Sequence, residues 1–226
     1  MPKTEITLAG EVFVADLSGA LFHPASGTLV VADLHFEKGS FFATRRQMLP
    51  PYDTAASLAK LNRAIARYAP NRLIALGDSF HDLRAGERLS LDDAKAILAL
   101  GHGRDLIWIT GNHDSELPSG LPGDRMDEMM LGSITLLHQP TTLARAEIAG
   151  HLHPVARVAT SGGLLRRRCF AQSADKLILP AFGAYTGGLN IRDPAFMSVF
   201  HGIVPRAYVL GDTKVFSVPA ARTRPD

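Results

Sequence analysis

Residues 28–35 read Thr28-Leu-Val-Val-Ala-Asp-Leu-His35, an apolar run that is closed by two polar side chains. The β-branched and apolar residues predict a buried strand over 28–32. Side chains alternate in an extended chain, so Asp33 and His35 are expected to point to the same side. A carboxylate and an imidazole that converge in this way are typical of a metal site.

The same pattern of a short apolar strand followed by a polar turn recurs along the chain. Strands are predicted at residues 72–76, 106–110, 134–137, 147–149 and 177–179. Helices are predicted between the first three strands, one from an N-cap at Asp53 to a stop at Pro70 and one from an N-cap at Ser90 through Leu98. Strands that alternate with helices predict a parallel sheet. Strands and turns dominate after residue 130 and predict a second, mostly antiparallel sheet.

We therefore expect an α/β (α+β) fold in which two packed β-sheets, flanked by helices, form a single domain over residues 1–226. The chain has 226 residues, of which 46% are hydrophobic and 20% are charged, as in a soluble globular domain. The single cysteine, Cys169, cannot form an internal disulfide. No signal peptide and no apolar run of roughly 18 to 20 residues is present, which excludes a membrane span and favours the cytoplasm.

The overall charge indicates no class of partner, because 24 Lys and Arg against 22 Asp and Glu leave a net charge of +2. The charge is unevenly distributed, however. Residues 1–139 carry 13 basic and 17 acidic side chains (−4), whereas residues 140–226 carry 11 and 5 (+6). The first part is suited to hold cations and the second to hold anions.

Polar residues follow the other predicted strands as well, where open α/β sheets usually bind their ligands. They are Asp78 in Gly77-Asp78, Asn112, His113 and Asp114 in Gly111-Asn-His-Asp114, His138, and His151 and His153 in Gly150-His-Leu-His153. Each fragment alone is a common turn sequence, but their combination after successive strands points to one site. Imidazole and carboxylate ligands without thiolates suit Mn²⁺, Fe, Zn, Ni or Co better than Mg or Ca.

These motifs and their order resemble the calcineurin-like metallophosphoesterase superfamily, whose pattern is D-x-H, G-D, G-N-H-D/E, H and G-H-x-H. The resemblance implies a two-sheet sandwich and two divalent transition-metal ions, with Mn²⁺ the first expectation. It implies that Asp33, His35 and His153 hold one ion, that Asn112, His138 and His151 hold the other, and that Asp78 bridges them. His113 would face the substrate and protonate the leaving oxygen, and Asp114 would orient its imidazole.

A more specific resemblance, to the bacterial ligase-associated DNA damage response endonucleases, covers nearly the whole chain. It rests on the segments Val31–Ser40, Met48–Asp53, Gly77–Asp82 and Leu179–Asn190. It implies a phosphodiesterase that cuts DNA, single-stranded DNA first, and that works beside an ATP-dependent DNA ligase and a helicase. The alternatives are a phosphoesterase for nucleotides or other small-molecule phosphates, and a scaffold without catalysis, which the complete ligand set disfavours. The oligomeric state stays open.

Several basic residues have two interpretations. Lys38 and Arg45 follow the first motif and are expected to contact a DNA backbone, although a solvated loop would look the same. His81 is expected either to touch substrate or to cap a turn. Arg166, Arg167 and Arg168 are expected in a strand, either as a charged edge or as a phosphate contact. The glycine-rich segment Gly183–Asn190 is interpreted as a structural turn.

Overall fold

The structure is a computed structural model that describes residues 4–47 and 49–226, so Met48, in the motif at 48–53, and residues 1–3 lie outside it. Among the described residues, seven strands form the first sheet in the order β1-β2-β3-β4-β5-β6-β7. These strands are β1 (Thr4–Leu8), β2 (Glu11–Ala15), β3 (Leu21–His23), β4 (Thr28–Ala32), β5 (Arg72–Leu76), β6 (Asp105–Ile109) and β7 (Asp124–Met126). Neighbouring strands from β1 to β4 are antiparallel, and those from β4 to β7 are parallel.

The second sheet is mixed. Its strands are β8 (Glu128–Leu131), β9 (Ile134–Leu137), β10 (Glu147–Ala149), β11 (Pro154–Thr160), β12 (Gly163–Ser173), β13 (Lys176–Ile178), β14 (Leu189–Asn190), β15 (Arg206–Leu210), β16 (Val215–Val218) and β17 (Thr223–Arg224). Most of its strand pairs are antiparallel, as expected, but β9, β10 and β13 run parallel, and so do β11 and β14. Because the chain returns between β9 and β10 through residues 138–146, both strands end at the same edge.

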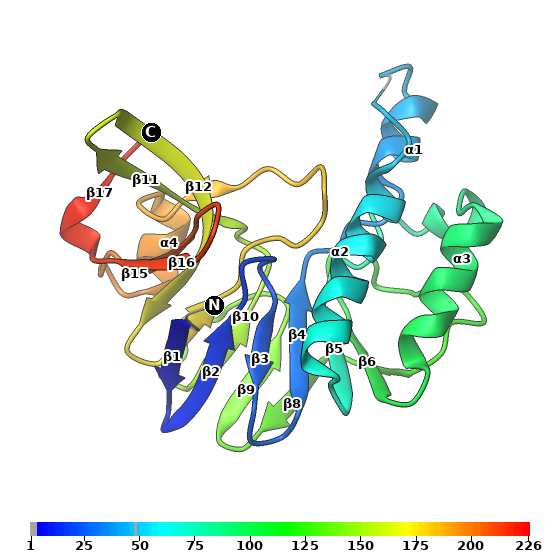
Figure 1. The fold of residues 1–226 in the computed structure, drawn as a ribbon, viewed down its shortest axis with the longest axis horizontal. Coiled ribbons are helices and arrows are strands. Elements are labelled where there is room, and N and C mark those ends of the chain that lie inside the picture. The colour runs from blue at the N-terminus through cyan, green and yellow to red at the C-terminus, as the bar shows by residue number, and fades with distance from the viewer. Residues whose placement is uncertain (1–3, 48) are drawn as a thin grey trace.

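The helices are α1 (Lys38–Thr44), α2 (Asp53–Tyr68), α3 (Leu91–Leu98) and α4 (Pro194–Val199). The last three cover the outer faces of the two sheets, whereas α1 projects beyond them (Figure 1). α2 and α3 lie over the first sheet, where Leu58, Leu61 and Ile97 join its core, and α4 packs on the second through Phe196. Ser90 caps α3 by accepting the backbone N–H of Asp93, as predicted. Tyr52 is the N-cap of α2 rather than Asp53, which is the first residue of the helix.

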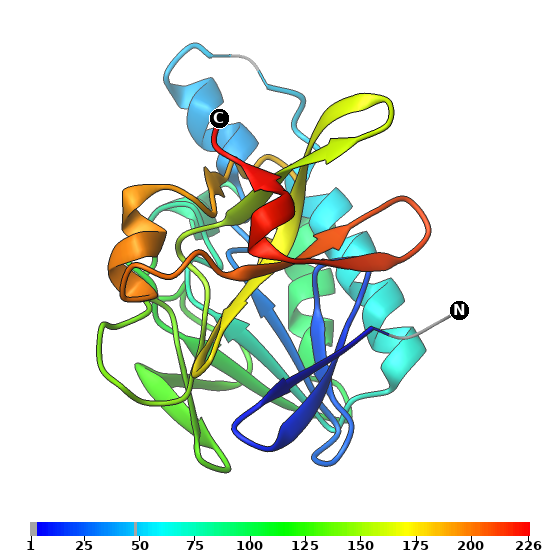
Figure 2. The same cartoon turned by 90° about the vertical axis from the view of Figure 1, so that its left-hand side faces the viewer.

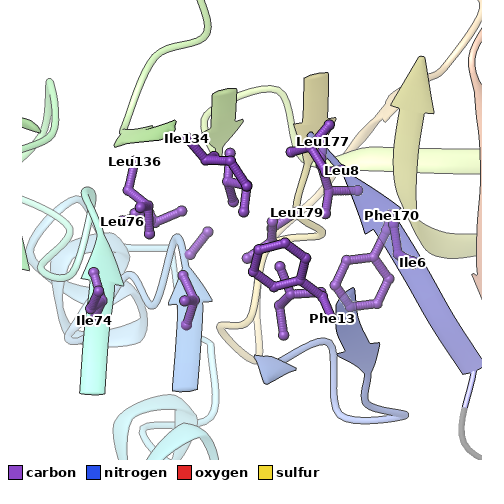
Figure 3. Close-up of a cluster of buried hydrophobic side chains, with 14 of the residues drawn as sticks. Ile6, Leu8, Phe13, Ile74, Leu76, Ile134, Leu136, Phe170, Leu177 and Leu179 are labelled. Carbon is purple, nitrogen blue, oxygen red and sulfur yellow. The ribbon is translucent and has the colours of Figure 1, made fainter. Parts of the chain in front are cut away.

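The main core lies between the sheets (Figure 3). Ile6, Phe13 and Leu76 of the first sheet meet Leu136 and Phe170 of the second, and all five are fully buried. With helices on both outer faces, this gives the two-sheet sandwich expected from the sequence. The residues of β4 are buried on both faces, which explains why its sequence is a continuous apolar run. No helix in the described ranges is long and apolar enough to cross a membrane.

The charged segment Arg166–Arg168 pairs with β11 on one side, whereas β15 and β13 pair with the later residues 169–173 of β12. Within the described ladders this segment has a single neighbouring strand, as the interpretation of a charged edge expects. α1 and the β11–β12 hairpin project from the same end of the molecule in both views (Figures 1 and 2). These two projections flank the edge at which the parallel strands end.

Candidate metal centre

The polar motifs of the first sheet meet at one edge because their strands are parallel. Asp33 and His35 follow β4, Asp78 follows β5, and Asn112 and His113 follow β6. From the second sheet, His138 follows β9 and His151 and His153 follow β10, which also run parallel. The edge between the two sheets therefore collects all of the residues that the motifs single out.

Several of these residues have a left-handed backbone rather than an extended one. The φ angles are +54° at Asp33, +46° at His35, +48° at Asp78, +67° at His151 and +47° at His153. The alternation expected for an extended chain is thus the wrong reason for the convergence of Asp33 and His35. Left-handed backbone costs non-glycine residues free energy and persists where the surroundings enforce it, as is common at functional sites.

The side chains form two clusters, and within each cluster the candidate donor atoms lie within 4.8 Å of one another. In the first, His153 Nε2 lies 3.2 Å from Asp33 Oδ1 and 3.5 Å from His35 Nε2. The second contains Asp78, His138 and His151, with His151 Nδ1 3.2 Å from His138 Nε2. The Asn112 side-chain oxygen lies 3.0 Å from the same nitrogen of His138. Each cluster can hold a divalent cation.

Asp78 belongs to the second cluster but also faces the first, and it turns one oxygen toward each. Its Oδ2 is 3.9 Å from His35 Nε2, and its Oδ1 is 3.4 Å from His138 Nε2. The backbone N–H of His113 also donates to Oδ1, at 2.9 Å, which fixes the carboxylate. A carboxylate in this position can bind two cations at once.

The orientation of His138 is fixed by the backbone. Its Nδ1 lies 3.0 Å from the carbonyl oxygen of Leu76, which can only accept, so Nδ1 carries the hydrogen and Nε2 faces the cluster. Burial disfavours the protonated ring, but the hydrogen bond to Asp78 and the charge of Asp33 outweigh this and raise the pKa to about 9. The carboxylates that stabilise this proton would equally stabilise a metal cation in its place.

The protonation states of the other ligands suit a metal ion. Burial, with a smaller effect of the neighbouring His153, lowers the pKa of His35 to about 2 against the opposing charge of Asp78, so the ring is neutral. For Asp78, burial opposes ionisation, yet His138 and the His113 N–H hold its pKa well below the ordinary value. Neutral imidazole and ionised carboxylate are the forms that bind metals, so the residues present fit two divalent ions.

His113 lies beside this centre, next to His81. Its Nδ1 lies 2.9 Å from the carbonyl oxygen of His81, so this nitrogen donates and Nε2 is left for another partner. The two rings stack with centroids 5.2 Å apart. Burial and the positive charge of Lys38 lower the pKa of His81 to about 4, and its ring is neutral near pH 7.

Asp114 does not contact the imidazole of His113, contrary to the role expected from the sequence. Its buried carboxylate accepts four backbone N–H groups, those of Asp78, Ser79, Phe80 and Gly111, at 2.6 to 3.1 Å. The carbonyl of His81 takes the predicted place beside the ring. Asp114 therefore ties the Gly77-Asp78 turn to the Gly111-Asn112 turn.

The other expected substrate contacts lie around α1. Lys38 is its first residue, and burial lowers the pKa of its ammonium against the opposing charges of Asp53 and Asp78. Arg45 follows the helix, with its guanidinium 4.3 Å from the centre of the Phe41 ring. Phe41 in turn lies 4.6 Å from the His81 ring, and no periodic pattern in the sequence pointed to this neighbour.

The glycine-rich segment after β13 packs directly on the first motif. The N–H of Phe182 donates to Ala32 O, and that of Gly183 donates to Asp33 O. A β-carbon at Gly183 would overlap the carbonyl of Leu34, so this close approach requires glycine. The segment is a structural turn, as interpreted, but one that supports the backbone of a candidate ligand.

No protein-family model and no curated protein sequence matches this chain. Among solved structures, the crystal structure of Pseudomonas putida nuclease MPE is similar over 96% of this chain and 100% of its own, at 28% identity and a TM-score of 0.75. The chain has a metallophosphoesterase fold. The phosphoesterase Yfce from E. coli aligns with 84% of this chain and 97% of its own, at 15% identity and a TM-score of 0.41. The two His/Asp clusters and the similarity to nuclease MPE identify this chain as a metal-dependent phosphoesterase, and the clusters are consistent with a dinuclear metal site.

Proposed function

We propose that this metallophosphoesterase is an endonuclease that hydrolyses phosphodiester bonds of single-stranded DNA. The position of Asp78 between two His/Asp clusters carries the proposal, because it suits two cations that share one phosphoryl group. Similarity to a nuclease over nearly the full chain supports DNA as the substrate. Residues 1–226 are proposed to form one domain. Joint action with an ATP-dependent DNA ligase and a helicase stays a prediction.

In this proposal the two clusters supply the metal ligands. Asp33, His35 and His153 hold one ion, Asn112, His138 and His151 hold the other, and Asp78 contacts both. Mn²⁺ is the first expectation from the family resemblance, and the imidazole, amide and carboxylate donors without thiolate would also suit Fe, Zn, Ni or Co. Bound ions of this kind lower the pKa of water and neutralise charge that develops on the phosphoryl oxygens.

A side chain of the protein is proposed to donate the proton to the leaving group. Because the carbonyl of His81 holds Nδ1 of His113, Nε2 is the ring nitrogen that can give a proton to the oxygen that departs. The ring of His81 lies beside the candidate ligand His35, with the two Nδ1 atoms 3.4 Å apart, and Lys38 is the first residue of α1. Both are proposed to contact the substrate. Arg45 is proposed as a more distant contact, because its charge lies over Phe41.

The test is nicking of circular single-stranded DNA with added Mn²⁺, with Asp78→Asn as the matched variant. Losing one carboxylate weakens both metal sites, so wild type should cut while the variant should not, which also excludes a contaminating nuclease. If neither protein cuts DNA while wild type hydrolyses bis(p-nitrophenyl) phosphate, the substrate is a small-molecule phosphate instead. If wild type hydrolyses neither substrate, the proposal is wrong.

A further inference from the structure

Three arginines lie in one row across the projecting end of the second sheet. In the strand register, Arg157 of β11 is opposite Arg166 of β12 on one side and opposite Arg224 of β17 on the other. Directly paired residues share a face of the sheet, and so do residues two apart along a strand. Arg168 therefore lies on this face too, and the arginine row is defined here as Arg157, Arg166 and Arg224.

Placing like charges directly opposite one another destabilises a sheet unless an anion compensates. Within the described part of the chain, the one carboxylate that forms a salt bridge to the row is Asp226, whose Oδ1 lies 3.3 Å from Arg166 Nε. Arg157 instead donates to Pro225 O at 3.0 Å, and Arg224 donates to Ala221 O and Thr223 O. Neutral carbonyls orient these guanidinium groups but do not cancel their charge.

The row begins close to the metal centre. Arg166 Nη2 donates to the carbonyl of Gly188 at 2.8 Å, and a β-carbon at Gly188 would overlap the carbonyl of His153. Arg168, on the same face, donates to the carbonyls of Ala181, Ala184 and Thr186, in the segment that also supports Asp33. The cationic face is thus joined to the segment at 181–188, which packs on the backbone of both Asp33 and His153.

We propose that the arginine row binds backbone phosphates of the DNA strand on one side of the bond that is cut. This inference rests on the proposed endonuclease function and assigns that function a binding track. Guanidinium groups bind phosphate through a planar pair of N–H donors, and the strand spacing of about 4.8 Å spreads three of them over roughly 10 Å. An anionic chain rather than a single small anion fits a row of that length.

Arg167 provides a matched control. It is the next residue of β12, its side chain points to the opposite face, and its Nη2 lies 3.6 Å from Asp212. Replacing Arg167 removes one positive charge from β12, as replacing Arg166 alone does, without touching the row. If only the overall positive charge matters, substitutions on either face should weaken DNA binding equally. If the row binds phosphates, only substitutions on its own face should weaken it.

The experiment compares Arg157→Gln/Arg166→Gln with Arg167→Gln in Mn²⁺-dependent cleavage of a single-stranded oligonucleotide over a range of salt. We expect the double variant to raise KM for DNA about tenfold and to lower the slope of log affinity against log salt by about 1.4, near 0.7 for each phosphate that is no longer neutralised. Arg167→Gln should keep the wild-type KM and slope. The double variant should lose much more activity on DNA than on bis(p-nitrophenyl) phosphate. Retained hydrolysis of the small substrate would show that its metal site is folded.

Arg157→Lys extends the test, since lysine keeps the charge and should retain most of the salt dependence. Equal KM values and slopes for the double variant and for Arg167→Gln, with wild type active on DNA, would overturn the track alone. A wild type that cuts no DNA would overturn the proposed function and the track with it. If the row binds an acidic protein segment in place of DNA, the double variant and Arg167→Gln should likewise have equal KM values and salt slopes for DNA.

Discussion

The backbone of Gly77 lies directly against the ring of His138, and a β-carbon at this position would overlap the ring. Gly77 also has a φ of +69°, which alanine adopts only at a cost. We expect Gly77→Ala to displace His138, to destabilise the protein by at least about 2 kcal/mol, and to weaken Mn²⁺ binding in calorimetric titration.

Gly187→Ala is the control for this change, because a β-carbon there meets no atom within 4 Å and φ is not in the left-handed range. It should bind Mn²⁺ like wild type. Normal metal binding by Gly77→Ala would show that His138 has room to move and still coordinate.

Replacing His113 should affect turnover much more than metal binding. His113→Gln removes the proton donor and should lower kcat on DNA by about 10²- to 10⁴-fold. The loss should be far smaller with bis(p-nitrophenyl) phosphate, because p-nitrophenolate departs without a proton. Equal losses on both substrates would rule out the acid role, and Mn²⁺ titration checks that the metal sites persist.

Asp114 is expected to act on structure rather than on chemistry. In the wild type each carboxylate oxygen of Asp114 accepts two backbone N–H groups. In Asp114→Asn the amide nitrogen replaces one of these oxygens and leaves two donors without an acceptor, so we expect a loss of about 3 kcal/mol in the free energy of unfolding. Urea titration of the metal-free protein measures this loss. A variant as stable as wild type but with impaired kcat would instead place Asp114 in catalysis.

Lys60 predicts a pH dependence of stability. Burial, followed by the charges of Arg168 and Arg63, lowers its pKa from 10.5 to about 7, while its Nζ donates to Phe182 O. At a pH between these two pKa values, Lys60 is protonated in the unfolded chain and neutral in the folded chain. The contribution of Lys60 therefore makes the free energy of unfolding rise with pH.

The slope from Lys60 is at most about 1.4 kcal/mol per pH unit. Urea midpoints of wild type and Lys60→Met at pH 7, 8 and 9 measure it, since effects of other groups cancel in the difference. A difference that stays constant with pH would mean that the folded protein keeps Lys60 charged.

Strands and helices with a strong apolar pattern were predictable. The runs at 28–32, 72–76 and 134–137 are strands with the predicted bounds, and those at 106–110 and 177–179 are displaced by one residue. Ser90 was predictable as a cap because it precedes Asp93 by three residues. α1 was missed, since seven residues with adjacent phenylalanines give no helical periodicity.

The residues of the site could be named from their order, but their geometry could not. The left-handed φ angles at Asp33 and His35 depend on contacts from distant segments, such as the N–H of Gly183 on Asp33 O. Asp114 has the sequence position of a catalytic partner, but its burial beside four N–H donors is a tertiary property. The arginine row depends on strand register, which pairs residues 157, 166 and 224 across the sheet.

The candidate ligands come from both sheets, with Asp33 and Asp78 on the first and His138, His151 and His153 on the second. Any ion bound here joins the two halves of the sandwich at one edge, in addition to the apolar core between them. Because such an ion binds the folded chain alone, its concentration raises the free energy of unfolding. The supply of transition metal in the cell would therefore set how long each molecule survives proteolysis, as well as whether it is active.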